Sequence, residues 1–278
     1  MIRYSDIPKQ SKIIKNELNR GLEKVFHSGA FIRGKYLKKF EDKFSKKIGI
    51  KYCLGVGNGT DALEIAIESL NLPKNSEIIV PANSFIASAE APYRLGLKLV
   101  FCDCDTLNYT IDTSRIESLI NKNTKAIIAV HLYGHPCNMS KLMSLKKKYK
   151  LKIIEDCAQS HFAKYKNKFT GTLGDIGCFS FFPGKILGAY GDAGCITTNN
   201  KNLFLKMKKI SNHGGLKKYA HDLVGRNSRM DEIQALVLLH KLNYIDRWLR
   251  HRIRLAGLYT KLFEKNNGIE VVLTSKDC

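Results

Sequence analysis

Short apolar runs alternate with amphipathic segments through most of the chain, and this alternation limits the possible folds more than any other feature. The runs that predict strands lie at 52–56, 77–80, 98–102, 126–130, 151–154 and 191–198. The segments that show helical three- and four-residue spacing lie at 61–70, 84–95, 113–120 and 139–149. Apolar strands separated by helices are typical of a parallel sheet covered on both faces. We therefore predict an α/β fold with a mostly parallel central sheet.

Further helices are predicted on either side of this pattern. Ser11 can cap a first helix that ends near Gly29, and a second amphipathic helix ends near Gly49. Beyond Asn227 a long amphipathic pattern continues, with a break, to about Phe263. The segment 268–273 looks like the first strand of a new unit.

The net charge is strongly positive, since 46 Lys and Arg against 25 Asp and Glu give +21. A nucleic-acid binder would gather this charge on one face. Here the basic pairs and triplets recur along the whole chain, mostly on the predicted helices. We interpret them as solvated helix faces and expect no nucleic-acid partner, although a basic nucleic-acid binder is the alternative that the charge suggests.

The eight cysteines are spread through the chain, several of them inside apolar runs, which indicates reduced thiols. Cys102 and Cys104 are two residues apart, but the other ligands of a zinc site are missing from their surroundings, so we expect no metal. The chain begins with polar residues, and no apolar run approaches the ~20 residues that span a bilayer. We expect a cytoplasmic protein with no membrane partner.

The stretch 171–194, GTLGDIGCFSFFPGKILGAYGDAG, places Lys185 between an apolar run and a series of glycines. In a lysine-rich chain, a single lysine is usually a solvated surface residue. Here Pro183 and Gly184 end the strand just before the lysine, and three glycines follow it at 188, 191 and 194. Because glycine permits backbone geometries that other residues resist, we expect something to approach this backbone closely.

Three other features lie where predicted strands end, the edge at which parallel α/β sheets bind ligands. The turn 57–60 opens a helix whose free N–H groups could hold a phosphate, or it is an ordinary helix cap. Asp156 ends an apolar strand, with Gln159 three residues later, and could equally cap the next helix. Phe85 offers an aromatic face for a planar ring, but taken alone it is more typical of a core.

These features meet the needs of pyridoxal phosphate when they are taken together. The lysine would bond covalently to the cofactor, and an aspartate beside the pyridine nitrogen would keep that nitrogen protonated. The combination is far more specific than any of its parts.

Four stretches, in order, resemble the DegT/DnrJ/EryC1/StrS family of nucleotide-sugar aminotransferases: GVGNGTDALEIAI (55–67), IIEDCAQSH (153–161), GDIGCFSFFPGKILGAYGDAGCITTN (174–199) and GRNSRMDEIQA (225–235). The resemblance implies the fold-type I aminotransferase architecture and pyridoxal 5'-phosphate as the cofactor. It also implies that Lys185 carries the cofactor and shuttles protons, and that Asp156 faces the pyridine nitrogen. Further implied contacts are Gln159 at the ring hydroxyl, Phe85 on the ring face, and Gly59, Thr60 and Ser180 at the phosphate. Asn227 from the second subunit of a homodimer would complete the phosphate site.

The resemblance further implies the reaction. Family members that dehydrate sugars at C3 carry histidine at the position of Lys185, so the lysine favours transamination. The run VHLYGHPCNM (130–139) is most similar to members that aminate a dTDP-linked 3-keto-6-deoxyhexose. We therefore expect transfer of an amino group from L-glutamate to such a keto-sugar nucleotide, for surface polysaccharide or glycan biosynthesis. A 4-keto sugar nucleotide is the alternative substrate.

Full-length family members continue beyond the position of residue 278 into a smaller domain. We therefore expect a large cofactor-binding domain at 1–227, and at 228–278 connecting helices with the start of an incomplete, truncated C-terminal small domain. A catalytically dead truncated member that acts only as a binding or assembly partner is the alternative. That alternative predicts an intact dimer that turns over no keto-sugar.

Overall fold

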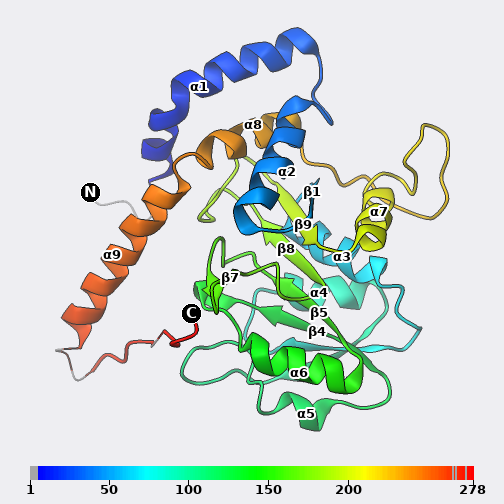
Figure 1. The fold of residues 1–278 in the computed structure, drawn as a ribbon, viewed down its shortest axis with the longest axis vertical. Coiled ribbons are helices and arrows are strands. Elements are labelled where there is room, and N and C mark those ends of the chain that lie inside the picture. Colours follow the sequence, from blue (N-terminus) through cyan, green and yellow to red (C-terminus); the bar gives the residue numbers. More distant parts are fainter. Residues whose placement is uncertain (1–5, 265, 267, 273) are drawn as a thin grey trace.

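The computed structural model describes residues 6–264, 266, 268–272 and 274–278, and it centres on a seven-stranded sheet (Figure 1). The strands lie in the order β1 (Tyr52–Val56), β9 (Gly194–Thr198), β8 (Ile176–Ser180), β5 (Lys152–Asp156), β4 (Thr124–Val130), β2 (Glu77–Pro81) and β3 (Lys98–Cys102). β9 is antiparallel to β1 and β8, and the other neighbouring strands are parallel. The predicted α/β class with a mostly parallel sheet is confirmed. A separate two-stranded ribbon consists of β6 (Lys164–Tyr165) and β7 (Lys168–Phe169).

The register of the sheet brings several strand ends to one edge. Asp156 pairs with both Val130 and Cys178, so β4, β5 and β8 end close together. Gly194 of β9 pairs with Val56 on one side and Ser180 on the other. The turn that follows β1 therefore leaves the sheet at the same edge as the ends of β5 and β8.

Side chains of the strands alternate between two apolar cores. Ile78 and Val80 pack beneath α3 (Gly59–Ser69), α4 (Ala87–Arg94) and α7 (Lys201–Ile210). Ile79 lies on the other face, with α5 (Ile116–Leu119) and α6 (Met139–Tyr149). Both faces are thus covered, as a central parallel sheet requires.

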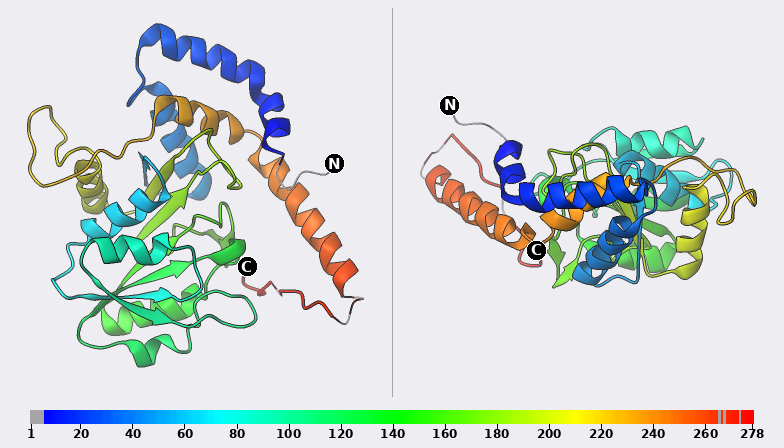
Figure 2. Two further views of the ribbon diagram at one scale, coloured as in Figure 1. Left: turned by 180° about the vertical axis from the view of Figure 1, so that it is seen from behind. Right: turned by 90° about the horizontal axis from the view of Figure 1, so that it is seen from above.

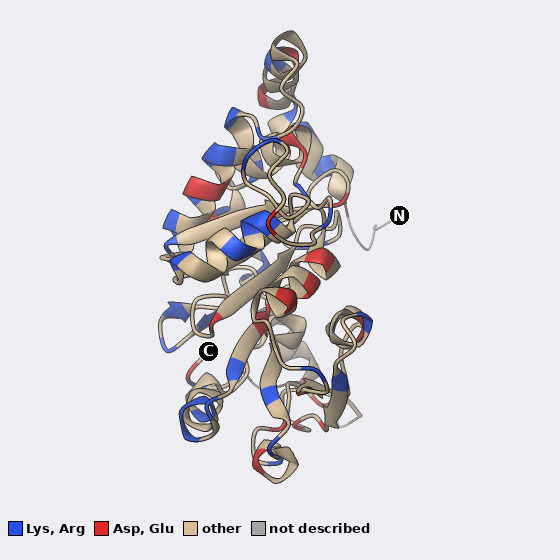
Figure 3. Ribbon diagram, turned by 90° about the vertical axis from the view of Figure 1, so that its right-hand side faces the viewer, with Lys and Arg blue, Asp and Glu red and all other residues tan. Residues whose placement is uncertain are grey.

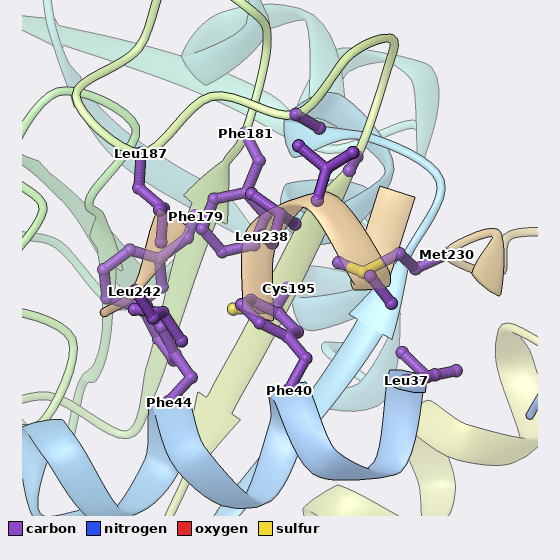
Figure 4. Packing of buried hydrophobic residues seen from close by; sticks show 14 of the residues in the cluster. Leu37, Phe40, Phe44, Phe179, Phe181, Leu187, Cys195, Met230, Leu238 and Leu242 are labelled. Atoms are coloured by element: carbon purple, nitrogen blue, oxygen red, sulfur yellow. The ribbon is translucent and has the colours of Figure 1, made fainter. Parts of the chain in front are cut away.

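A third core packs α1 (Ile7–Ser28), α2 (Lys35–Ile48) and α8 (Glu232–Lys241) against β8, β9 and the loop between them. Figure 4 shows the part of this core in which side chains of α2 and α8 meet those of β8 and β9. Phe40 and Phe44 of α2 are fully buried and meet the Phe181 ring edge to face, with centroids 5.4 and 5.7 Å away. Phe44 also lies 5.1 Å from the Phe179 ring centroid. These rings fix the strand that leads into the Lys185 loop.

β1 is an edge strand, and a carboxyl group from α2 covers part of its edge. Glu41 Oε1 accepts the N–H of Gly55 at 2.7 Å. Burial raises the pKa of Glu41 to about 7, although the Gly55 N–H acts in the opposite direction. A donor that is bonded in this way is no longer free to pair with a strand of another chain.

Helix boundaries differ from the sequence prediction by three residues or more at three places. α1 begins at Ile7, and Asp6 rather than Ser11 caps it by accepting the N–H of Lys9 at 3.2 Å. The apolar pattern that located this helix begins only at Ile14, so it missed the first turns, in which no residue from 7 to 13 is buried. The segments 113–120 and 84–95 are helical only over α5 and α4, because each opens with turns that precede the first regular helical hydrogen bond.

The pattern beyond Asn227 forms two helices, α8 and α9 (Ile245–Phe263), with the expected break between them. α9 extends away from the sheet on the side where α1 begins (Figures 1 and 2). The strand predicted at 268–273 is wrong for residues 268–272, which pair with no strand in the described chain, and residue 273 lies outside the described residues. The division into domains at residue 227 stays a prediction.

The surface is basic over several elements. Figure 3 shows Lys and Arg on separate helices and loops, with acidic positions among them. This distribution agrees with the interpretation of the lysines as solvated helix faces. Within the part of the chain that the structure describes, no helix combines the length and apolar character needed to cross a bilayer.

Candidate active site

A cavity of about 990 Å³ opens at the carboxyl edge of the sheet, at the upper end of the roughly 300–1,000 Å³ typical of small-molecule sites. Seven of the eight predicted site residues line it: Gly59, Thr60, Phe85, Asp156, Gln159, Ser180 and Lys185. Asn227 is not among the lining residues; it is exposed and its backbone pairs with that of Asn212. One chain therefore assembles the predicted site except for Asn227.

One end of the cavity is suited to an anion. Gly59 begins α3 and faces Ser180 so closely that a Cβ on Gly59 would lie 2.6 Å from the Ser180 Cβ. The Asn58 side chain caps the helix by accepting the N–H of Asp61 at 2.8 Å. The first N–H groups of a helix have no partner inside it and carry the positive end of its dipole. With the hydroxyls of Thr60 and Ser180 beside them, they make a cradle that could hold a phosphate.

His161 fixes the backbone of this cradle, and sequence patterns alone did not indicate it. Its Nε2 donates to the carbonyl oxygen of Ser180 at 2.9 Å. Burial lowers the pKa of the imidazole to about 3, so the ring is neutral near pH 7. Its Nδ1 has no partner among the described residues, and the ring packs 5.8 Å from Phe179 and 5.6 Å from Phe181. His161 is the last residue of the stretch 153–161, but its position in the sequence does not predict which way its side chain points.

Asp156 ends β5, is 7% exposed as a residue and lines the cavity. Oδ1 accepts the N–H of Ala158 at 3.1 Å, and Oδ2 accepts the hydroxyl of Ser88 at 2.8 Å. Ser88 in turn lies 2.8 Å from the hydroxyl of Ser84. The carboxylate is thus held as an acceptor. Ser88 supports the Asp156 carboxylate, and the sequence analysis did not identify it. Its four-residue spacing from Ser84 could have indicated only that the two serines lie on one face of a helix.

Glu155 is fully buried and serves a different purpose from its neighbour Asp156. It accepts N–H groups from three residues of the loop 171–174, at 2.8, 2.8 and 2.6 Å, and lies 3.0 Å from His131 Nε2. Its carboxylate, His131 and the Cys157 thiol offer ligand atoms within 4.8 Å of one another, as metal ligands do. Since the carboxylate already has four hydrogen-bonding partners, this cluster is better explained as an anchor for the loop that precedes β8.

Lys185 lies in the loop after β8 and is partly buried. Burial lowers the pKa of its ammonium, while the charge of Asp156 acts in the opposite direction. A lowered pKa makes the neutral amine more accessible, as a nucleophile or base requires. The close approach expected at this backbone comes from the chain itself, since a Cβ on Gly188 would clash with the carbonyl oxygen of Pro183.

Gln159 and Phe85 present free groups to the cavity. Gln159 Oε1 accepts the N–H of Tyr133 at 2.8 Å, so its NH₂ group is the end that remains for a ligand. Phe85 is 70% exposed, which excludes the alternative that it is a core residue. Its ring therefore has a face available for stacking.

The sequence profile of the DegT/DnrJ/EryC1/StrS aminotransferase family matches residues 12–277. The chain belongs to this family. The predicted resemblance and the aminotransferase fold are confirmed.

Relatives within the family include sugar transaminases. The dTDP-3-amino-3,6-dideoxy-alpha-D-galactopyranose transaminase of Aneurinibacillus thermoaerophilus is 43% identical over 259 residues, which are 93% of this chain and 71% of that relative. The dTDP-3-amino-3,4,6-trideoxy-alpha-D-glucose transaminase of Streptomyces venezuelae is 34% identical over 276 residues, 99% of this chain and 73% of that relative. A protein of Geobacillus stearothermophilus named as a pleiotropic regulatory protein is 41% identical, over 98% of this chain and 73% of its own length.

Two solved structures of similar proteins superpose closely on this chain. DesV of S. venezuelae, in complex with a ketimine intermediate, superposes with a TM-score of 0.96 at 34% sequence identity. The match covers 99% of this chain and 74% of the DesV chain. NtdA from Bacillus subtilis, with the cofactor PMP bound, gives 0.90 at 31% identity, covering 99% of this chain and 64% of its own. The expectation of a cofactor of the pyridoxal phosphate class is confirmed for the family.

The residues of this chain fit such a cofactor. The cradle at Gly59 and Ser180 suits its phosphate, Asp156 offers an acceptor for a ring N–H, and Lys185 offers the amine. These groups lie on different loops but line one cavity, as the chemistry of a single bound cofactor requires.

Part of the wall of this cavity consists of ion pairs that the sequence did not reveal. Arg226 pairs with Glu64 and, at 2.7 Å, with Glu68, while Arg94 Nε lies 3.0 Å from Glu64. Glu64, Arg94 and Arg226 all line the cavity. In the sequence the acidic residues of α3 look like an ordinary solvated helix face, because their partners lie far away along the chain.

Proposed function

We propose that this chain is a pyridoxal phosphate-dependent transaminase that transfers an amino group from L-glutamate to a keto-sugar nucleotide. The observation that carries the proposal is that Lys185, Asp156 and the cradle between Gly59 and Ser180 line a single cavity. Membership of the aminotransferase family supports the same reaction.

Each residue has a role that follows from its contacts. When bound, pyridoxal phosphate supplies an electron sink for the carbon whose amino group is transferred. Lys185, with its lowered pKa, holds the cofactor and moves protons at its Nζ. Asp156, fixed by Ser88, keeps the ring nitrogen protonated. The NH₂ group of Gln159 would donate to the ring hydroxyl, and Phe85 would stack on the ring.

We propose that the working enzyme is a cytoplasmic homodimer in which Asn227 of each chain completes the phosphate site of the other. Asn227 is exposed and lies outside the lining of its own cavity, which supports this arrangement. Gly59, Thr60 and Ser180 would supply the remaining phosphate contacts. A monomer would then have incomplete sites.

The proposed acceptor is a dTDP-linked 3-keto-6-deoxyhexose, used in surface polysaccharide or glycan biosynthesis. The relatives from A. thermoaerophilus and S. venezuelae, both named as dTDP-3-amino sugar transaminases, support this choice. A 4-keto sugar nucleotide is the competing substrate.

Incubation of the purified protein with pyridoxal phosphate, L-glutamate and a panel of keto-sugar nucleotides, followed by mass spectrometry, tests the reaction and the substrate together. We expect a 3-amino sugar nucleotide as the product. Lys185→Ala should abolish both the visible absorbance of the covalently held cofactor and turnover, whereas Lys201→Ala, at the exposed start of α7, should retain them. Visible absorbance in Lys185→Ala equal to that of the parent would show that another lysine holds the cofactor.

A further inference from the structure

Lys241, the last residue of α8, is a buried lysine without an acidic partner in the described part of the chain. It is 1% exposed, and its Nζ donates to the carbonyl oxygen of Gly188 at 2.6 Å. The same Nζ lies 4.4 Å from the centroid of the Tyr190 ring. Burial lowers the pKa of Lys241 to about 8. Burying a cation without a carboxylate costs free energy, so an apolar side chain would suit packing alone better.

The partner of Lys241 is the point at which the Lys185 loop closes. The N–H of Ala189 donates to Phe181 at 2.7 Å, and the N–H of Lys185 donates to Phe182 at 2.9 Å. Gly188 lies so close to Pro183 that no side chain fits between them. A hydrogen bond to Gly188 therefore fixes the base of a narrow loop that carries Lys185 only three residues away.

A second contact from α8 holds the same loop. Gln234 Oε1 accepts the N–H of Tyr190 at 2.8 Å. The Tyr190 hydroxyl donates to Ser11 of α1 at 2.6 Å. Glu232, the first residue of α8 and thus at the end opposite Lys241, accepts N–H groups at the start of α2. α8 is thus fixed to the body of the protein and contacts the loop at two points.

We propose that Lys241 is a positioning residue that holds the Gly188 carbonyl so that Lys185 Nζ is directed into the cavity toward Asp156. The proposal rests on the assignment of Lys185 as the cofactor lysine. Lys241 itself lies outside the cavity lining and touches no reacting atom. Its effect passes through the backbone of the loop 183–190.

The test compares Lys241→Met, which keeps the length but removes the donor, with Lys241→Arg, which keeps donors and charge. Lys201→Met, an exposed lysine on α7, is the matched control. The first measurement is competitive acetylation of the cofactor-free protein by acetic anhydride, with the rate at Lys185 read by mass spectrometry at several pH values. The second is the rate at which visible absorbance develops after pyridoxal phosphate is added.

We expect Lys241→Met to change the acetylation profile of Lys185 and to slow cofactor capture by about tenfold or more, since small misplacements of a reacting group have effects of this size. Lys241→Arg should recover part of the rate, and Lys201→Met should match the parent. An acetylation profile and capture rate in Lys241→Met equal to the parent's would overturn the proposal. A lower melting temperature with an unchanged Lys185 profile would also overturn it, because that result indicates a purely structural role.

If Lys241→Met does not fold, Lys241→Leu, which also removes the donor and keeps an apolar side chain, decides the question by the same acetylation measurement. A changed Lys185 profile supports the positioning role and an unchanged one overturns it. The acetylation result does not depend on the cofactor. If the parent fails to capture pyridoxal phosphate, the proposed function fails while the positioning of Lys185 is still measured.

Discussion

Gly59 and Ser180 are in such close contact that a Cβ on Gly59 would lie 2.6 Å from the Cβ of Ser180. The start of α3 and the end of β8 can approach in this way only because residue 59 has no side chain. The contact places helix N–H groups next to a serine hydroxyl at one end of the cavity. The phosphate cradle therefore depends on a glycine whose importance is steric.

Gly59→Ala should weaken binding of pyridoxal phosphate by about tenfold or more, because separating α3 from Ser180 removes hydrogen bonds to a charged group that are worth roughly 1.5–3 kcal/mol each. A titration followed by visible absorbance measures the affinity. Gly257→Ala on α9 is the control, since a Cβ there meets open space. Equal affinity in the two variants would show that the cradle does not bind the phosphate.

Ser88→Ala should lower kcat by about tenfold while leaving the fold intact, because the Asp156 carboxylate loses a donor at 2.8 Å and hydrogen bonds to charged groups contribute roughly 1.5–3 kcal/mol. Steady-state kinetics with the keto-sugar substrate measure the effect. Ser118→Ala, an exposed serine of α5, should behave like the parent. A Ser88→Ala enzyme with unchanged kcat would exclude a supporting role for this hydroxyl.

Phe40→Ala should lower the stability of the fold, whereas Phe85→Ala should weaken cofactor binding. Phe40 is fully buried against Phe181, so its truncation should lower the free energy of unfolding by about 3–5 kcal/mol. Phe85 is 70% exposed, so its truncation should leave stability almost unchanged but weaken cofactor binding. Denaturant unfolding and absorbance titration separate the two effects. A large loss of stability in Phe85→Ala would contradict its assignment to the cavity wall.

Glu41 should make stability depend on pH. Burial raises its pKa from 4.5 to about 7, so the folded chain binds this proton more tightly than the unfolded chain does. The resulting stabilisation is fully present below about pH 4.5 and is lost as the pH rises through about 7. Glu41→Gln keeps an acceptor for Gly55 without ionising, so it should flatten this dependence and melt at a higher temperature than the parent above pH 7.

Thermal melts from pH 4 to pH 8 check the Glu41 prediction. Glu23→Gln, an exposed residue of α1, should leave the pH dependence as in the parent. A Glu41→Gln profile parallel to the parent's over the whole range would mean that Glu41 ionises normally in the folded protein.

The sequence by itself determined the α/β class, the positions of most helices and strands, and seven residues of the cavity. Hydrophobic periodicity is a local signal, and it survives folding because it decides which face each element buries. The turn at 57–60, the strand end at Asp156 and the glycine series after Lys185 mark the edge where parallel sheets bind ligands. Ser180 and the individual roles of the site residues came from the family resemblance.

Only the tertiary structure decided which side chains support those residues. Ser88 contacts Asp156 across 68 residues of sequence, and Lys241 contacts Gly188 across 53. No local sequence pattern distinguishes a helix serine or a helix-end lysine that has a buried partner from one that is exposed to solvent. Their roles follow from the path of the chain, because a hydrogen bond depends on positions in space that only the packed fold defines.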